Sequence, residues 1–183
     1  MGRIVDAAYS TMIRAILENR TPNLFALSYN MDDWKVTDVL LIPHFAFPIS
    51  AIEKRKPLSP TARRAGWVGC NILLHAIPPD ARIAIVRAGK PTPPAEVRRE
   101  YARLKPLAQL EPKQRGWTLD VLNGVRSLGK KDFNIAEAYT LEAHLSRLHP
   151  ANHNVQPKIR QQLQVLRDLG LVEFCGSGNY RLR

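Results

Sequence analysis

Apolar residues at helical spacing begin the chain. Ile4, Ala8, Met12 and Ile16 recur every four residues, with polar side chains between them, which predicts an amphipathic helix over residues 4–19. Short apolar runs at 24–29, 34–47, 67–74 and 82–86 predict strands. Pro94 begins a second predicted helix, over 94–104. Helices among several strands predict an α/β layer.

The second half of the chain has a different pattern. Thr118 is a predicted N-cap of a helix that Gly129 ends, and Asn134 caps a second predicted helix over 135–148. A third follows over 155–169, and the apolar runs 171–174 and 180–182 predict a β-hairpin. This is the element order of a winged helix. Because 105–114 has two prolines and no clear periodicity, we predict domains at 1–110 and 111–183.

Charge indicates the class of partner. Lys and Arg outnumber Asp and Glu by 27 to 16, a net charge of +11 that favours polyanions through counterion release. A basic protein without such a partner is the alternative. Cys70 and Cys175 form no C-x-x-C pair, so no zinc site or disulfide framework is predicted. Without an apolar run long enough to cross a bilayer or a secretory signal, we expect a cytoplasmic protein with no membrane partner.

The third predicted helix has a polar face suited to a DNA groove. Amides can read adenine, and cations can hold guanine or phosphate. The alternative is an ordinary solvated face. The candidate DNA-binding residues here are Gln156, Lys158, Arg160, Gln161 and Gln162, with Arg181 in the hairpin.

A cationic loop is the strongest local signal in the first half. Its five candidate DNA-binding residues, with no acid among them, are Lys54, Arg55, Lys56, Arg63 and Arg64. The loop leads into Trp67, between Gly66 and Gly69, and a flat indole beside cations can enclose a base and its methyl group. A core tryptophan at the start of a strand is the alternative.

The acidic residues form only an incomplete version of a nuclease motif. Such a motif needs an Asp and a Glu-x-Lys strand that share one face around a metal. Asp38 precedes Glu53, but the lysines that follow, Lys54 and Lys56, fall on the wrong face of a strand. The histidines form no ligand set. We therefore predict no catalytic residue and no metal ligand.

Five stretches together resemble the DpnI-like, Dam-replacing family of methyl-directed type II restriction endonucleases. The most specific is 55–72, RKPLSPTARRAGWVGCNI, and the others are 4–9, 23–29, 115–117 and 158–168 with the hairpin. The resemblance implies a partial PD-(D/E)xK nuclease core, a helix plus mixed sheet, followed by a winged helix. It also implies binding to duplex DNA with adenine-methylated GATC, and Mg²⁺-dependent cleavage of both strands.

The resemblance assigns residues as well. It places Trp67, with Arg63 and Arg64, in the reader of the methyl groups, and 158–167 in the winged-helix reader. In the family, the metal-binding Asp, the Glu-x-Lys strand and the cysteine pairs of a structural zinc precede the helix expected from Ile4. We therefore expect this chain to bind DNA without magnesium or zinc and to be inactive alone. We expect it to be a monomer. The missing strands would leave a sheet edge unpaired, which predicts low stability or association of the N-terminal unit.

Two other functions remain open. A divergent active site would use Asp38 and Glu53 with magnesium. Alternatively, the chain is a winged-helix transcription regulator, for which the cationic loop would be incidental. Equal binding of GATC duplexes with and without N6-methyladenine would refute the methyl-directed hypothesis, unchanged digestion after Glu53→Ala would rule out the active site, and specific binding to unmethylated promoter DNA would support the regulator.

Overall fold

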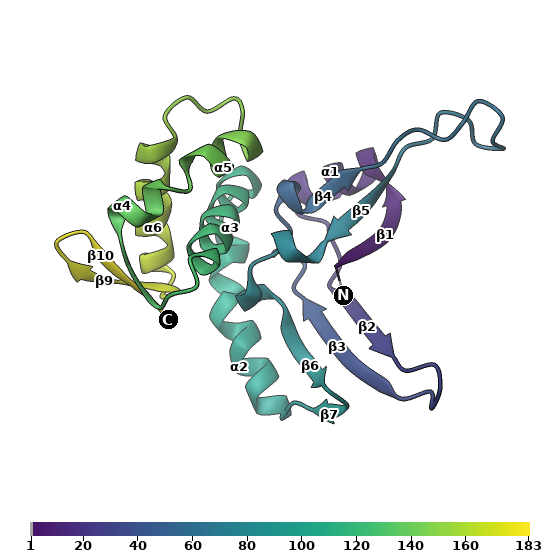
Figure 1. The fold of residues 1–183 in the computed structure, drawn as a ribbon, viewed down its shortest axis with the longest axis horizontal. Coiled ribbons are helices and arrows are strands. Elements are labelled where there is room, and N and C mark those ends of the chain that lie inside the picture. Colours follow the sequence, from purple (N-terminus) through teal and green to yellow (C-terminus); the bar gives the residue numbers. More distant parts are fainter. Residues whose placement is uncertain (1) are drawn as a thin grey trace.

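The computed structural model describes residues 2–183 and shows a strand-rich N-terminal unit beside a helical C-terminal unit (Figure 1). The N-terminal unit holds two small sheets, in the orders β1-β5-β4 and β2-β3-β6-β7. Their strands are β1 (Arg3–Ala8), β2 (Leu24–Tyr29), β3 (Val36–Ile42), β4 (Ile52–Lys54), β5 (Gly69–Leu73), β6 (Ile83–Arg87) and β7 (Lys90–Pro91). The helices of this unit are α1 (Tyr9–Leu17) and α2 (Pro94–Leu104).

The first predicted helix is partly wrong, because residues 3–8 form strand β1. This strand pairs antiparallel with β5, with Ile4 opposite Ile72, and its residues alternate between exposed and half-buried. A spacing of four, as from Ile4 to Ala8, fits both a strand and a helix, so the apolar pattern could not distinguish them. The helix starts only at Tyr9, whose N–H donates to the backbone oxygen of Val68.

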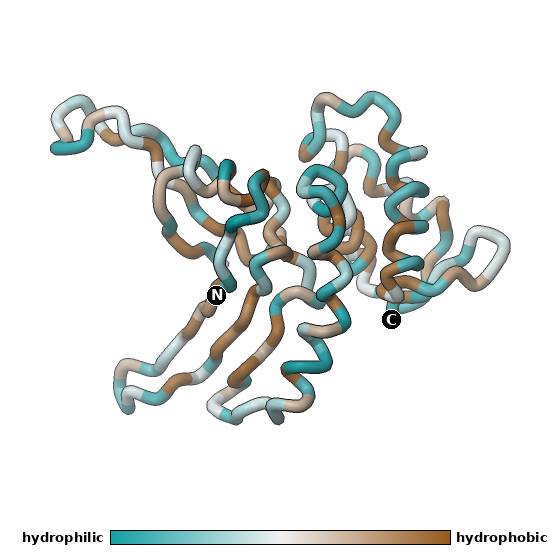
Figure 2. Tube along the Cα trace, turned by 180° about the vertical axis from the view of Figure 1, so that it is seen from behind, coloured by the Kyte–Doolittle hydropathy of each residue, from teal (hydrophilic) through white to brown (hydrophobic). Residues whose placement is uncertain are grey.

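The four-stranded sheet extends away from the body as a long hairpin, β2–β3, with α2 packed against β6 (Figure 1). Helix α2 has the predicted bounds. The α/β class is confirmed, because helices and sheets occur together. The expected mixed sheet is not seen, because all strand pairs within residues 2–183 are antiparallel. The strands of the hairpin carry apolar segments, coloured brown, whereas the turn between them is largely hydrophilic (Figure 2).

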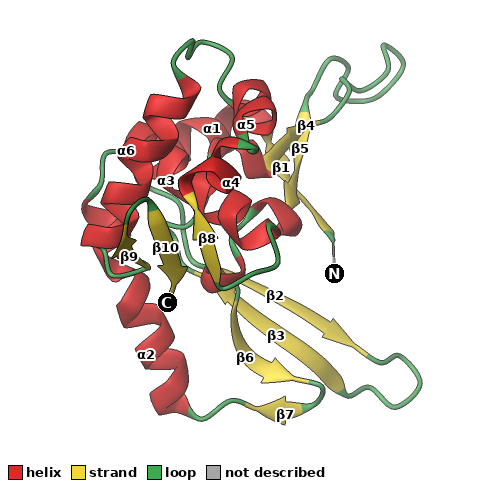
Figure 3. Ribbon diagram, turned by 60° about the vertical axis from the view of Figure 1, so that its left-hand side comes forward, coloured by secondary structure: helices red, strands yellow, loops and turns green. Residues whose placement is uncertain are grey.

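The C-terminal unit has the helical order and hairpin of a winged helix. Its elements are α3 (Pro112–Ser127), β8 (Asp132–Asn134), α4 (Ile135–Tyr139), α5 (Glu142–Leu148), α6 (Val155–Asp168), β9 (Val172–Gly176) and β10 (Asn179–Leu182). Figure 3 shows α3 to α6 gathered together, with β8, β9 and β10 at their side. The sheet order β8-β10-β9 adds a strand that the sequence pattern missed.

Two helix predictions in this unit need correction. Thr118 is not an N-cap, because α3 begins six residues earlier at Pro112 and Thr118 lies buried inside it. The predicted helix over 135–148 is broken between Tyr139 and Glu142 into α4 and α5. Asn134 does cap α4, where its side chain and that of Glu137 form a reciprocal capping box.

One hydrophobic core runs through both units. The cluster of buried residues is continuous from Ile16 and Ile42 in the first unit to Leu122 and Ile159 in the second. Helix α3 packs on α1 and on the 3₁₀ turn Ile49–Ala51, which joins the units. Within the described chain, no helix has the length and apolar character needed to span a bilayer.

Candidate nucleic-acid interface

Helix α6 presents a polar face to solvent. Its inner face, with Ile159, Leu163 and Leu166 fully buried, packs against α3. Residues three and four apart share a helix face. The residues opposite the buried stripe are therefore exposed together, and they include Arg160, Gln161 and Gln164. Gln164 was missing from the sequence-predicted site, although helical periodicity places it beside Arg160.

Gln162 does not belong to this surface, which corrects the sequence prediction. Its side chain has no exposed area, and its Oε1 accepts a hydrogen bond from the Thr118 hydroxyl of α3 at 2.7 Å. Periodicity alone could have shown this, because Gln162 lies between Ile159 and Leu166 on the buried side of the helix. Its polar character suggested exposure, but the partner that satisfies it lies 44 residues away in the sequence.

The other polar residues of α6 are held by neighbours to different degrees. Gln156 Nε2 donates to Glu142 Oε2 at 2.7 Å, so this amide is engaged with α5. Lys158 Nζ donates to Gln161 Oε1 at 2.8 Å and also lies 5.9 Å from the centre of the Trp117 ring. By contrast, Arg160 forms no ion pair or side-chain hydrogen bond within residues 2–183. Arg160 is thus the free cation of this face.

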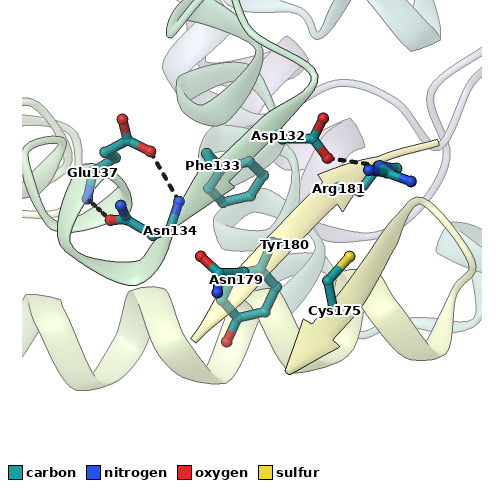
Figure 4. A pocket seen from close by; sticks show the side chains of 8 residues that line it. All are labelled: Asp132, Phe133, Asn134, Glu137, Cys175, Asn179, Tyr180 and Arg181. Atoms are coloured by element: carbon teal, nitrogen blue, oxygen red, sulfur yellow. Dashed lines mark hydrogen bonds and ion pairs between the residues drawn. The ribbon is translucent and has the colours of Figure 1, made fainter. Parts of the chain in front are cut away.

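The wing is the hairpin of β9 and β10, and neighbouring residues hold it in place. Gly176, Ser177 and Gly178 have φ values of 86°, 47° and 75°, which allow the tight turn between β9 and β10. The Phe133 and Tyr180 rings stack at a centroid distance of 5.5 Å. They lie in a shallow pocket of about 360 Å³ between the wing and β8 (Figure 4). The polar groups around the pocket bind one another, Arg181 with Asp132 and Asn134 with Glu137, which indicates that they stabilise the hairpin.

Arg181 is one of those paired groups. Its Nε donates to Asp132 Oδ1 at 2.6 Å, and that hydrogen bond raises the pKa of Arg181 (Figure 4). Arg183 similarly pairs with Glu173. Arg181 therefore reaches DNA only with its carboxylate partner beside it, which weakens its predicted contribution.

The cationic loop, residues 54–66, projects from the end of β4 and β5 that is far from the wing (Figure 1). Its base is a two-stranded ribbon, because Arg55 N–H donates to Gly69 O and Leu58 N–H donates to Trp67 O. Leu58, Ala62, Arg63 and Arg64 line a shallow hollow at its tip. The loop is thus an ordered, exposed projection with a hollow between its two arms.

None of the five loop cations pairs with a carboxylate of the described chain. Elsewhere in residues 2–183, nine of the 22 Lys and Arg side chains have an acidic partner within 4.0 Å. Lys54 lies over the Tyr9 ring and Arg64 over the Trp67 ring, at 5.6 and 5.4 Å from the ring centres. The charge of the loop is therefore not neutralised locally, and it attracts polyanions.

Trp67 lies half-buried at the base of this loop, flat against the start of β5. A Cβ on Gly69 would lie 2.8 Å from the Cη2 and Cζ3 atoms of the indole. Glycine at this position is thus what allows the ring to approach the backbone. With one indole face under Arg64, the ring combines a flat apolar surface with an adjacent cation.

The two acids that could imitate a nuclease centre lie in different sheets. Asp38, in β3, accepts hydrogen bonds from the N–H of Ala88 and the Ser28 hydroxyl, and the Ala88 N–H lowers the pKa of Asp38. Glu53, in β4, binds Arg3 and Asn71. No group of three or more His, Cys, Asp or Glu suited to a metal ion occurs in the described residues. The acids present do not fit the magnesium centre that the resemblance implies.

The cysteines likewise do not fit a zinc site. Cys70 is buried in β5 and its thiol donates to the backbone oxygen of Ala7 at 3.4 Å, while burial raises its pKa. Cys175 is exposed on the wing, in the other unit. The two thiols therefore do not form the cysteine pair that a structural zinc requires.

Asp80 connects the two units. Its carboxylate, 2% exposed, accepts hydrogen bonds from Arg103 Nη2 and from Arg126 Nε, each at 2.7 Å. Both arginines also donate to the backbone oxygen of Arg183, at 3.1 and 2.8 Å. A single buried carboxylate thus joins α2, α3 and the end of the wing.

A second connection between the units runs beneath helix α6. Asp120 of α3 accepts hydrogen bonds from the Ser50 hydroxyl and from His149 Nε2, the latter at 2.8 Å. The His149 ring stacks on Trp117 at a centroid distance of 3.7 Å, and Lys158 lies over the same indole. The base of α6 is therefore tied to the 3₁₀ turn that leads into β4.

Comparison with protein-family models covers nearly the whole chain. Residues 1–110 match a model described as the Dam-replacing family (DpnI). Residues 113–182 match one described as the Dam-replacing HTH domain. The second match agrees with the winged-helix arrangement of α3 to α6 and the β-hairpin.

Proposed function

Because this chain belongs to the DpnI-like, Dam-replacing family and ends in its HTH domain, we propose that it binds duplex DNA containing N6-methyladenine in the sequence GATC. The face of α6 with Arg160, Gln161 and Gln164 is placed on the helix that a helix-turn-helix fold inserts in the major groove. The winged helix thereby supplies base contacts, and the N-terminal unit adds a second surface.

The observation that carries the proposal is the unpaired charge of the cationic loop. Nine of the 22 Lys and Arg side chains elsewhere in residues 2–183 have acidic partners, whereas the five that are clustered in the loop have none. Phosphates would supply the missing partners and release their counterions. Trp67, at the base of the loop, offers a flat apolar surface on which a methylated base can stack.

Fluorescence anisotropy with labelled GATC duplexes tests both parts. We expect the fully methylated duplex to bind more tightly than the unmethylated one, and Trp67→Ala to remove most of that preference. Trp67→Phe, which keeps a flat ring, should retain part of it. Equal affinity of the unaltered chain for the two duplexes would refute the proposal. Preference for an unrelated unmethylated sequence would favour a transcription regulator.

Salt dependence tests the loop separately. The double variant Arg63→Ala/Arg64→Ala should lower the slope of log affinity against log salt by about 2, because each phosphate contact contributes close to one. The matched control is Arg20→Ala/Lys35→Ala, which removes the same charge from exposed, acid-paired positions. An equal change of slope in both variants would show that net charge alone acts.

We further propose that these residues bind the methylated site without cutting it. Asp38 and Glu53 lie in different sheets and are occupied by other partners, so they do not form a common metal centre. Methylated supercoiled plasmid incubated with the chain and Mg²⁺ should remain intact. Cleavage that disappears in Glu53→Ala would instead establish a divergent active site.

A further inference from the structure

We propose that Gln161 is fixed as a hydrogen-bond donor and reads the guanine of GATC, and that Lys158 and Gln162 are the residues that position its amide. The inference rests on the proposed function for the identity of the DNA sequence. It departs from the expectation that the amides of α6 read adenine.

The direction of each hydrogen bond follows from which groups can only donate. A lysine ammonium has no acceptor, so the Gln161 atom that lies 2.8 Å from Lys158 Nζ is the amide oxygen. The same oxygen lies 3.4 Å from Gln162 Nε2. A carbonyl oxygen has two lone pairs, so these two donors occupy both. The NH₂ group of Gln161 is left free on the exposed face.

Gln162 is itself oriented from below. Its Oε1 accepts from the Thr118 hydroxyl at 2.7 Å, which leaves its NH₂ directed toward Gln161. If the Gln162 amide turned over, its oxygen would face the oxygen of Gln161, and neither could donate. The ammonium of Lys158, which can only donate, thus fixes which end of Gln161 reaches the groove, and the buried Thr118 hydroxyl satisfies the matching orientation of Gln162.

The bases differ in what they offer such a donor. A bidentate contact from Gln to adenine needs the amide oxygen to accept from N6 while the NH₂ donates to N7. With the oxygen of Gln161 occupied, only the NH₂ half remains. Guanine presents two adjacent acceptors, N7 and O6, in the major groove, whereas cytosine presents a donor there. A donor-only amide therefore favours guanine, with its two acceptors, over adenine, which presents one acceptor beside a donor, and over cytosine, which presents only a donor.

A double-mutant cycle on the full chain tests this assignment. The methylated GATC duplex is compared with one in which 7-deazaguanine replaces the guanine, which removes N7. For the unaltered chain we expect the replacement to weaken binding about tenfold, the worth of one good base contact. In Gln161→Ala the same replacement should cost almost nothing, while Gln164→Ala, the matched control on the same face, should keep the penalty.

The positioning role has its own variant, Lys158→Met/Gln162→Met, which frees the oxygen of Gln161 and leaves Gln161 in place. We expect the 7-deazaguanine penalty to fall to about that of Gln161→Ala. Loss of the Lys158 charge weakens both duplexes alike, so the ratio of affinities is the readout. Thr118 remains satisfied in this variant, because its hydroxyl also lies 2.9 Å from Gln114 O. Thermal unfolding by circular dichroism checks that the fold is kept.

Two results would overturn the inference while the proposed function stands. One is methyl-dependent binding in which the penalty persists in Gln161→Ala. The other is a penalty that appears with 7-deazaadenine and depends on Gln161. Equal binding of methylated and unmethylated duplexes by the unaltered chain refutes the proposed function, and the guanine assignment with it.

Discussion

Replacement of Asp80 by alanine should destabilise both units at once. The substitution leaves Arg103 and Arg126 without their shared carboxylate, with only the backbone oxygen of Arg183 in common. Removal of one partner from a buried ion pair costs roughly 3–5 kcal/mol. The two arginine side chains are 38% and 24% exposed, so water partly compensates. We therefore expect a loss of about 2–3 kcal/mol in the free energy of unfolding.

For a chain of this size, that loss corresponds to a decrease of about 4–12 °C in the Tm. Thermal unfolding followed by circular dichroism measures it, and urea unfolding gives the free energy. Asp80→Asn, which keeps the shape and one acceptor, should have a smaller effect. Asp168→Ala is the matched control, because Asp168 pairs with Arg167 at an exposed position. If Asp80→Ala lowered the Tm no more than Asp168→Ala does, the buried carboxylate would not join the units.

Three further predictions follow from particular contacts. Gly69→Ala, whose Cβ would meet the Trp67 ring at 2.8 Å, should displace the indole and lower the preference for methylated DNA in the anisotropy assay, with unmethylated binding unchanged. The pKa of Glu137 is lowered by its hydrogen bond to Lys130, so the folded state favours the charged form; its stabilising effect is present above the ordinary pKa of about 4.5 and is lost as pH falls further. Urea unfolding from pH 7 to 3 should show the wild-type advantage over Glu137→Gln disappear in that window, and a constant difference would contradict the assignment. The β2–β3 hairpin exposes large apolar side chains, including Trp34 at 76%, and patches of more than a few hundred Å² are rare on monomers, so sedimentation should show concentration-dependent association that Trp34→Ser reduces.

Local signals in the sequence predicted a good part of this fold. Pro94 at the first position of α2, Asn134 at the cap of α4 and the glycines of the wing act on backbone within three residues of themselves, so the sequence shows their effects without the rest of the chain. The family resemblance is confirmed, because family models match both halves of the chain.

Errors arose where the deciding partner lies far away in sequence. β1 is a strand because it pairs with β5, some 65 residues later, and its apolar spacing fits a helix equally well. Gln162 is buried because Thr118 satisfies it, and Thr118 was itself misread as a cap.

The continuous core has a consequence for how such genes can recombine. The domain boundary predicted near residue 111 suggests a simple fusion, in which the winged helix is joined to another enzyme. Helix α3, however, contributes Leu119, Val121 and Leu122 to the same buried cluster as Ile42 and Phe45 of the first unit. A transplanted C-terminal unit would carry part of that cluster uncovered. Functional chimaeras should therefore contain α1 and the Ile49–Ala51 turn together with the winged helix, because α3 packs on both.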